Sequence, residues 1–107
     1  MAGIPENILQ LIIEYIKELS NEIEIDKVFI FGSYAKNSYN KDSDIDIAIF
    51  SKDFNDETKI EDMSYLLIKT SGLGIDLQPQ PFSIKDYEQP EGIVKEIVET
   101  WVELKVA

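Results

Sequence analysis

The 107-residue sequence contains neither cysteine nor histidine. The missing cysteines exclude disulfide bonds, thiolate metal sites and cysteine nucleophiles. Without histidine, no imidazole can ligate a metal ion or serve as a general base. Any chemistry that this chain performs must therefore use carboxylates, hydroxyls and lysines.

Positive charge is also scarce, because 10 lysines and arginines stand against 21 aspartates and glutamates, for a formal net charge of −11 at pH 7. Binding along a phosphate backbone depends on clustered basic residues that release counterions. We therefore expect no bulk binding of DNA or RNA. An acidic excess suits a divalent cation or a basic protein surface, although solubility alone would also explain it.

Long hydrophobic runs are absent as well. The apolar runs are only a few residues long, and the N-terminus has no basic flank followed by a long apolar stretch. The sequence thus predicts neither a membrane-spanning helix nor a signal peptide, and hence a cytoplasmic protein without a membrane partner. The length predicts a single domain over residues 1–107.

The hydrophobic pattern that is present predicts alternating helices and strands. Residues 5–20 carry apolar side chains at helical spacing, and residues 55–70 repeat this pattern behind an acidic first turn. Residues 28–31 (VFIF) and 45–50 (IDIAIF) have the β-branched and aromatic composition of strands. The order of these elements is typical of a small α/β protein.

The C-terminal part of the sequence predicts three more elements. Residues 75–78 form a third short strand, which we expect Pro79 and Pro81 to end because proline cannot donate to a strand ladder. A last helix is expected from about Glu91 onward. Residues 101–104 can then close the sheet as an edge strand.

Aspartates stand at the mouth of two predicted strands. Because neighbouring residues of a strand point to opposite faces, Asp44 and Asp46 share the face that the isoleucines of residues 45–50 do not use, and Asp76 has the matching parity. Two such charges repel by about 3 kcal/mol at an effective dielectric constant near 20. Mg²⁺ takes oxygen ligands and relieves this repulsion. The cluster of Asp44, Asp46 and Asp76 therefore predicts a metal site.

A candidate phosphate-binding segment lies at the end of the strand over residues 28–31. Gly32 and Ser33 follow this strand and are expected to open a short helix, where backbone N–H groups can receive a phosphate. The hydroxyl of Ser33 and the positive charge of Lys36 can add to that binding. Together these residues predict a phosphate site opposite the metal site.

The arrangement of Gly32-Ser33, ten intervening residues and Asp44-x-Asp46 resembles the signature of the minimal nucleotidyltransferase (MNT) family, in the DNA polymerase β-like superfamily. The likeness extends to the flanking strands, to Asp76 in a later strand and to the closing helix and strand. One departure is Asn37, which stands where the family often has glycine. Asparagine tolerates left-handed geometry, so the loop can survive this change.

This resemblance implies an α/β (α+β) fold with a small mixed β-sheet, helices packed on one face and an open palm on the other. It implies nucleotidyl transfer from a nucleoside triphosphate, with two Mg²⁺ ions as cofactors and ATP as substrate. By position, Gly32 and Ser33 would hold the triphosphate. Asp44 and Asp46 would bind both metals. Asp76 would bind the catalytic metal and help to activate the acceptor hydroxyl.

Three functions remain open at this point. Likeness to short stand-alone MNT proteins suggests an antitoxin that inactivates a HEPN ribonuclease toxin by attaching AMP to a tyrosine. The domain could instead neutralise its partner by contact alone, or could modify a small molecule in the manner of antibiotic nucleotidyltransferases. The presence of all three aspartates and the Gly-Ser pair favours activity. The chain also ends without the extra helical domain by which larger relatives grip the acceptor, so we expect substrate selection to reside in another protein.

Overall fold

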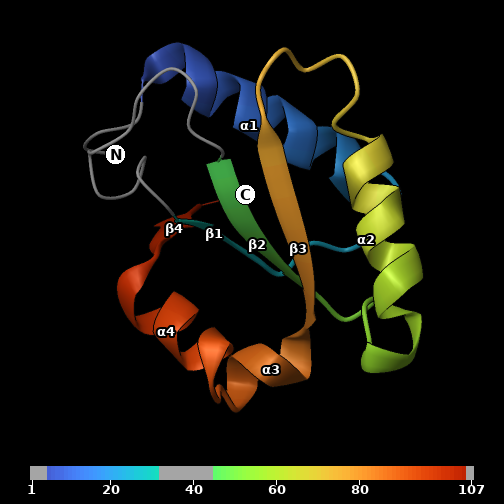
Figure 1. The fold of residues 1–107 in the computed structure, drawn as a ribbon, viewed down its shortest axis with the longest axis vertical. Coiled ribbons are helices and arrows are strands. Elements are labelled where there is room, and N and C mark those ends of the chain that lie inside the picture. The colour runs from blue at the N-terminus through green and yellow to red at the C-terminus, as the bar shows by residue number, and fades with distance from the viewer. Residues whose placement is uncertain (1–4, 32–44, 106–107) are drawn as a thin grey trace.

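A computed structural model describes residues 5–31 and 45–105, which form a four-stranded sheet flanked by helices (Figure 1). In chain order the elements are α1 (Glu6–Ser20), β1 (Lys27–Phe31), β2 (Ile45–Ser51), the 3₁₀ helix η1 (Asp56–Thr58), α2 (Lys59–Ile68), β3 (Leu77–Ser83), α3 (Ile84–Glu88), α4 (Ile93–Thr100) and β4 (Val102–Leu104).

The strands lie in the order β3-β2-β1-β4. β1 pairs antiparallel with β2 and β4, whereas β2 pairs parallel with β3. Parallel neighbours cannot be joined by a tight turn, and here α2 lies in the crossover between them. The predicted mixed sheet is confirmed, and the strands predicted over residues 28–31 and 45–50 are confirmed to within one residue at each end.

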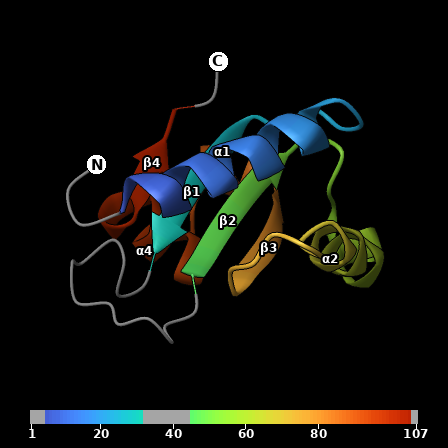
Figure 2. The same cartoon turned by 90° about the horizontal axis from the view of Figure 1, so that it is seen from above.

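Helices lie on both sides of the sheet (Figure 2). The predicted layer on one face corresponds to α1 and α2, whose buried side chains join the isoleucines of β2 in one core cluster. On the other face, α3 and α4 pack over part of the sheet, against a second cluster built on Phe29, Ala48, Phe50 and Phe82. Within the described ranges, no helix is long and apolar enough to span a bilayer.

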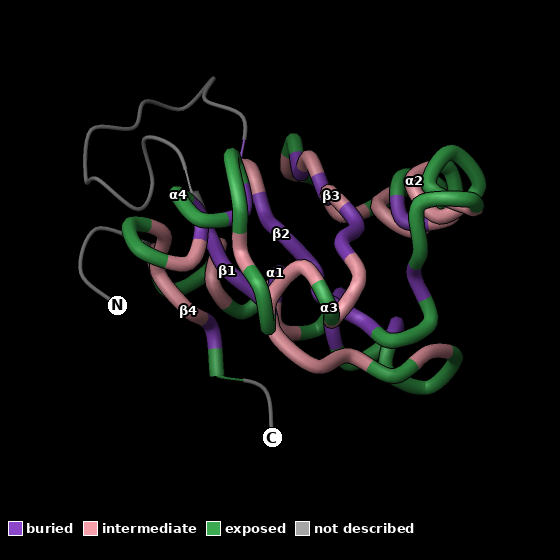
Figure 3. Tube along the Cα trace, turned by 90° about the horizontal axis from the view of Figure 1, so that it is seen from below, coloured by how far each residue is buried: buried purple, intermediate pink, exposed green. Residues whose placement is uncertain are grey.

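Burial is deepest in the two central strands, β1 and β2 (Figure 3). Ile45, Ile47 and Ile49 are buried on the α1 side, whereas Ala48 and Phe50 are buried on the α3 and α4 side. This alternation is the one that the sequence predicts for β2. The core therefore holds β2 firmly between two layers and fixes the direction of every side chain along it.

β3 differs from its prediction at both ends, because it begins at Leu77 instead of residue 75 and runs through Pro79 and Pro81 to Ser83 instead of ending at residue 78. The backbone carbonyl of Asp76 accepts a hydrogen bond from the N–H of Ile45 at 2.9 Å, so the backbone groups of even-numbered residues point toward β2. The odd-numbered prolines then direct their nitrogens away from β2, at the edge of the sheet, where no strand needs a donor. The missing N–H groups therefore do not interrupt the ladder.

Local capping defines the remaining helix boundaries. Asn55 accepts a hydrogen bond from the N–H of Thr58 at 3.0 Å, and Ser83 accepts one from the N–H of Asp86 at 3.3 Å. Such caps satisfy N–H groups that have no partner within a helix. After α2, Gly72 adopts a φ of 85°, a conformation that glycine adopts without a steric penalty. The helix predicted over residues 55–70 therefore ends close to its expected boundary, at Ile68.

Two sets of polar contacts connect α1 and the turn after it to α2 and its C-terminal end. The hydroxyl of buried Tyr15 donates to the backbone carbonyl of Leu66 at 2.8 Å, and burial raises the pKa of Tyr15. At the surface, Glu22 accepts hydrogen bonds from Lys69 at 2.7 Å and from the hydroxyl of Tyr65 at 2.8 Å. These two donors lower the pKa of the Glu22 carboxyl, whereas burial followed by the bond to Glu22 raises the pKa of Tyr65 to about 12.

The Glu22 contacts should appear as a pH dependence of stability. Because the pKa of Glu22 is lower in the folded protein than in the unfolded chain, these contacts stabilise the fold above the unfolded value and are lost as the pH falls through the folded value. We expect Glu22→Gln to lose less stability than the wild type between about pH 5 and about pH 3. Urea unfolding of both proteins across that range measures the difference. If the free energy of unfolding falls equally in both proteins as the pH is lowered, the Glu22 contacts contribute nothing to stability.

Candidate active site

Asp46 is the second residue of β2 and lies between the two neighbouring strands. It pairs with Phe31, the last residue of β1, and with Gln78 of β3. Its neighbours Ile45 and Ile47 are buried in the core cluster on the α1 side. Alternation along the strand therefore turns the Asp46 side chain to the opposite face, as predicted. It lies there outside the apolar cluster that α3 and α4 cover.

The surroundings of Asp46 disfavour the charged form of its carboxyl. Its side chain is half-buried, and loss of hydration raises the pKa of its carboxyl above the ordinary value. Within residues 5–31 and 45–105, no hydrogen-bond donor or basic side chain pairs with it. A half-buried carboxylate without a partner is destabilising until a cation or a donor approaches it.

Asp76 lies at the same end of the sheet, immediately before β3, where it is exposed. Its carbonyl accepts the hydrogen bond from Ile45, and its carboxylate accepts one from Nε2 of Gln78 at 2.9 Å. Residues that pair in a parallel ladder point to the same face, so Gln78 and Asp46 share a face. The structure therefore brings the Asp46 and Asp76 side chains to one end and one face of the sheet.

Gln78 is a residue of this site that the sequence pattern did not reveal. It stands two positions after Asp76, and this spacing alone would place both side chains on one face. Its proximity to Asp46 depends on the register between β2 and β3, which neither strand encodes by itself. A glutamine that holds one carboxylate and pairs with the residue bearing another can fix their relative positions.

Four of the predicted site residues, namely Gly32, Ser33, Lys36 and Asp44, lie outside the described residues, as does the short helix expected there. In the described part of the chain, no three acidic side chains form a metal-binding group. Asp46 and Asp76 supply two of the three aspartates of the predicted cluster. Both offer the hard oxygen atoms that Mg²⁺ prefers.

An aromatic cluster lies farther along the same face of β2 as Asp46. Phe50 stacks on Phe82 with ring centroids 5.3 Å apart. Phe29 and Tyr87 each pack edge-on against Phe50, with centroid distances of 5.7 Å and 5.6 Å. Phe29 and Phe50 are buried. Lys27 lies over the Tyr87 ring, with its Nζ atom 5.5 Å from the centroid.

Comparison with known proteins identifies the family of this chain. The model of the nucleotidyltransferase domain family matches residues 9–106. The chain belongs to this family. It is also similar to a protein of Methanocaldococcus jannaschii named "Putative protein adenylyltransferase MJ0141", with 42% identity over a match that covers 39% of this chain and 48% of that protein. The chain thus spans about half the length of that relative.

Two solved structures share the fold of this nucleotidyltransferase domain. One is described as a putative nucleotidyltransferase from Sulfolobus solfataricus, with a TM-score of 0.63 and 21% identity over 83% of this chain and 85% of that chain. The other is described as a toxin-antitoxin with AMP-PNP, with a TM-score of 0.60 and 20% identity over 96% of this chain and 75% of that chain. The predicted α/β (α+β) polymerase β-like fold is confirmed.

Proposed function

We propose that this nucleotidyltransferase domain transfers AMP from ATP to a hydroxyl group of a protein partner. The observation that carries the proposal is the half-buried carboxylate of Asp46, without a partner among the described residues, beside Asp76 at the end of the sheet. Membership of the family supports the reaction class. The names of the relatives support a protein as the acceptor and adenine as the base of the nucleotide, since one is a putative protein adenylyltransferase and another contains AMP-PNP.

The site residues fit Mg²⁺. In our proposal Asp44, Asp46 and Asp76 hold the ions. Burial removes water from the Asp46 carboxyl and raises its pKa, and a bound cation would offset that loss of hydration. When bound, two Mg²⁺ ions neutralise the charge on the attacking and leaving oxygens. Gly32, Ser33 and Lys36 are proposed to bind the triphosphate of ATP.

The chain's own residues would then serve an in-line displacement. The acceptor oxygen forms a bond to the α-phosphorus, the bond from that phosphorus to the bridging oxygen of the β-phosphate breaks, and pyrophosphate leaves with the electron pair. The acceptor's proton passes to the carboxylate of Asp76, since the chain has no histidine to take it. Gln78 holds that carboxylate in position through the 2.9 Å hydrogen bond.

For the acceptor we propose a tyrosine of a HEPN-type ribonuclease toxin, with this chain as its antitoxin. Two observations support a protein acceptor of this kind. A solved structure of the same fold is a toxin-antitoxin. The chain also carries a net charge of −11, which would steer a basic partner toward it.

The direct test uses two labelled substrates. Protein, Mg²⁺ and the purified toxin are incubated with ATP labelled at the α or at the γ phosphate, and label on the toxin is measured. We expect transfer of the α label alone, on a tyrosine. Transfer of the γ label alone would show a kinase-like reaction. If neither label is transferred, neutralisation by contact is the better explanation, and adenylylation of a small hydroxyl compound would favour the antibiotic-type alternative.

Gln78 provides a prediction specific to this geometry. We expect Gln78→Leu to slow α-label transfer by about 10-fold to 100-fold, as is usual when a partner that orients a metal-binding side chain is lost. Gln80→Leu is the matched control, because Gln80 lies on the same strand and the same face, two residues farther from Asp76. Single-turnover rates of both variants decide the matter. Equal rates would show that Gln78 does not position Asp76.

A further inference from the structure

The outer face of α2 exposes three large apolar side chains. Leu66 is the helix's one buried residue, whereas Ile60, Leu67 and Ile68 are 80%, 41% and 71% exposed. Residues seven and eight positions apart lie two turns along the same side of a helix. These three side chains therefore form an apolar strip on the side of α2 that faces away from the sheet, with exposed Ser64 between Ile60 and the other two. Apolar strips with polar borders mark sites of protein contact.

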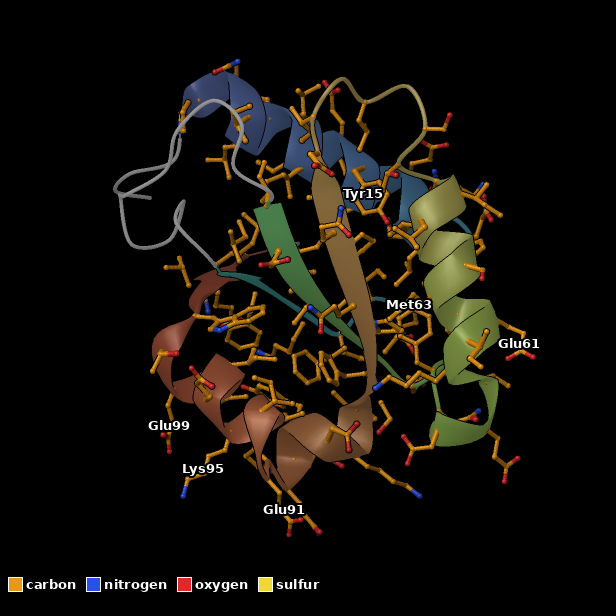
Figure 4. All side chains as sticks on the ribbon, viewed as in Figure 1. Tyr15, Glu61, Met63, Glu91, Lys95 and Glu99 are labelled. Carbon is orange, nitrogen blue, oxygen red and sulfur yellow. The ribbon has the colours of Figure 1, made fainter. Side chains whose placement is uncertain are left out.

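An acidic pocket borders this strip. It has a volume of about 400 Å³ and is lined by the carboxylates of Glu22, Asp53, Glu61 and Asp62 around the apolar groups of Ile23, Phe54 and Tyr65. Three of the carboxylates already accept hydrogen bonds from neighbouring groups. Glu61 has no such partner among the described residues, follows Ile60 directly and projects outward from α2 (Figure 4).

We propose that this surface, the apolar strip together with the acidic pocket, docks a basic amphipathic helix of a protein partner. Apolar side chains of that helix would pack on Ile60, Leu67 and Ile68. A lysine or arginine beside them would enter the pocket, where its alkyl stem contacts Phe54 and Tyr65 and its charge meets Glu61. This combination is the usual one when an amphipathic helix binds a groove.

The charge of the surface decides which occupant fits. A second copy of this chain, related by a two-fold axis, would bring Glu61 close to its counterpart in a chain that already carries −11 charges. An anionic lipid surface would be repelled by the same carboxylates. A cationic helix gains both the apolar contact and the ion pair, and so it is the occupant that we infer.

The proposed docking surface lies apart from the candidate active site. α2 flanks β3 at one edge of the sheet (Figures 1 and 2). Asp46 lies near the start of β2, on the face away from α1. A partner held on the outside of α2 leaves that face open to nucleotide. The inference rests on the proposed function only in expecting a protein partner, and it can be tested without ATP.

The experiment begins with photo-crosslinking of the full chain in its native cells. Ile68 is replaced by benzoylphenylalanine, and Glu99 on α4, far from α2, is replaced in the same way as a control (Figure 4). We expect residue 68 to crosslink to one protein, within a helical segment of net positive charge, and residue 99 not to do so. An adduct with a second copy of this chain, with lipid or with an acidic segment would overturn the proposal. So would equal crosslinking from both positions or none from residue 68.

The captured protein is then purified and its binding measured without nucleotide. Ile60→Gln and Ile68→Gln should each weaken binding by about tenfold or more, as expected for apolar anchors at an interface. Glu61→Lys should weaken it and reduce its dependence on salt. Ile93→Gln is the matched control, because Ile93 is 57% exposed on α4 and outside the surface. Unchanged binding in the α2 variants would overturn the proposal.

An Asp46→Asn variant keeps this test independent of the reaction. It should dock as well as the wild type while failing to transfer label. Docking without transfer in the wild type would refute the proposed reaction and leave the docking surface intact. Transfer that survives Ile60→Gln and Ile68→Gln with unchanged affinity would refute the docking surface and leave the reaction intact.

Discussion

Asp46→Asn is expected to reduce AMP transfer by at least about 1,000-fold. An amide is a poor ligand for Mg²⁺, and losing the ion's stabilisation of developing charge removes several kcal/mol from transition-state binding. Each 1.36 kcal/mol changes the rate by about tenfold. Single-turnover transfer of α-label to the partner measures the loss.

The same substitution should leave the ligand-free protein at least as stable as the wild type. Burial raises the pKa of Asp46, so keeping its charged form in the folded protein costs free energy, and a neutral amide avoids that penalty. Mg²⁺ with ATP should raise the Tm of the wild type and not that of the variant, because a ligand that binds only the folded state stabilises it. Unfolding of the ligand-free variant would mean that Asp46 is structural.

Phe50→Ala is expected to have the largest effect on stability. Phe50 is fully buried and contacts the rings of Phe29, Phe82 and Tyr87. Truncating a buried phenylalanine costs about 3–5 kcal/mol, out of a total of about 5–15 kcal/mol for an ordinary domain. The loss should appear as a large fall in the urea midpoint without a change in slope.

The control for this substitution is Ile93→Ala, which removes an apolar side chain that is mostly exposed. It should change stability by no more than about 0.5 kcal/mol. A loss below about 1 kcal/mol for Phe50→Ala would show that α3 and α4 collapse onto the vacated space. The aromatic cluster would then be less important to the fold than its contacts indicate.

Local patterns predicted the strands that hold Asp46. The alternation in IDIAIF fixes both the strand and the direction of its side chains, because one face must bury isoleucines. The predicted end of β3 at residue 78 was wrong. Whether a strand tolerates proline depends on whether it lies at an edge of the sheet, and that position is a property of the whole sheet. α3 has only five residues, too few to show a helical period.

The candidate site divides in the same way. Parity within each strand predicted that Asp46 and Asp76 face the same direction. The register pairs Asp46 with Gln78, and the hydrogen bond from Gln78 to Asp76 agrees with this placement. Gln78 escaped prediction because its importance comes from a partner on another strand. The exposure of the apolar strip on α2 was not predicted either, since Ile60, Leu67 and Ile68 have the same spacing as a buried helix face. Periodicity reveals that a helix has an apolar side, and not whether this chain covers it.

The prolines of β3 also determine how this sheet can meet other chains. An edge strand is a template on which a foreign strand can pair, and this is a common route to aggregation. Along the outer edge of β3, Pro79 and Pro81 lack the N–H groups that such a strand would need, and only Leu77 and Ser83 retain theirs at those positions. An incoming strand would meet carbonyl oxygens without the alternating donors. The prolines thus protect this border from strand addition.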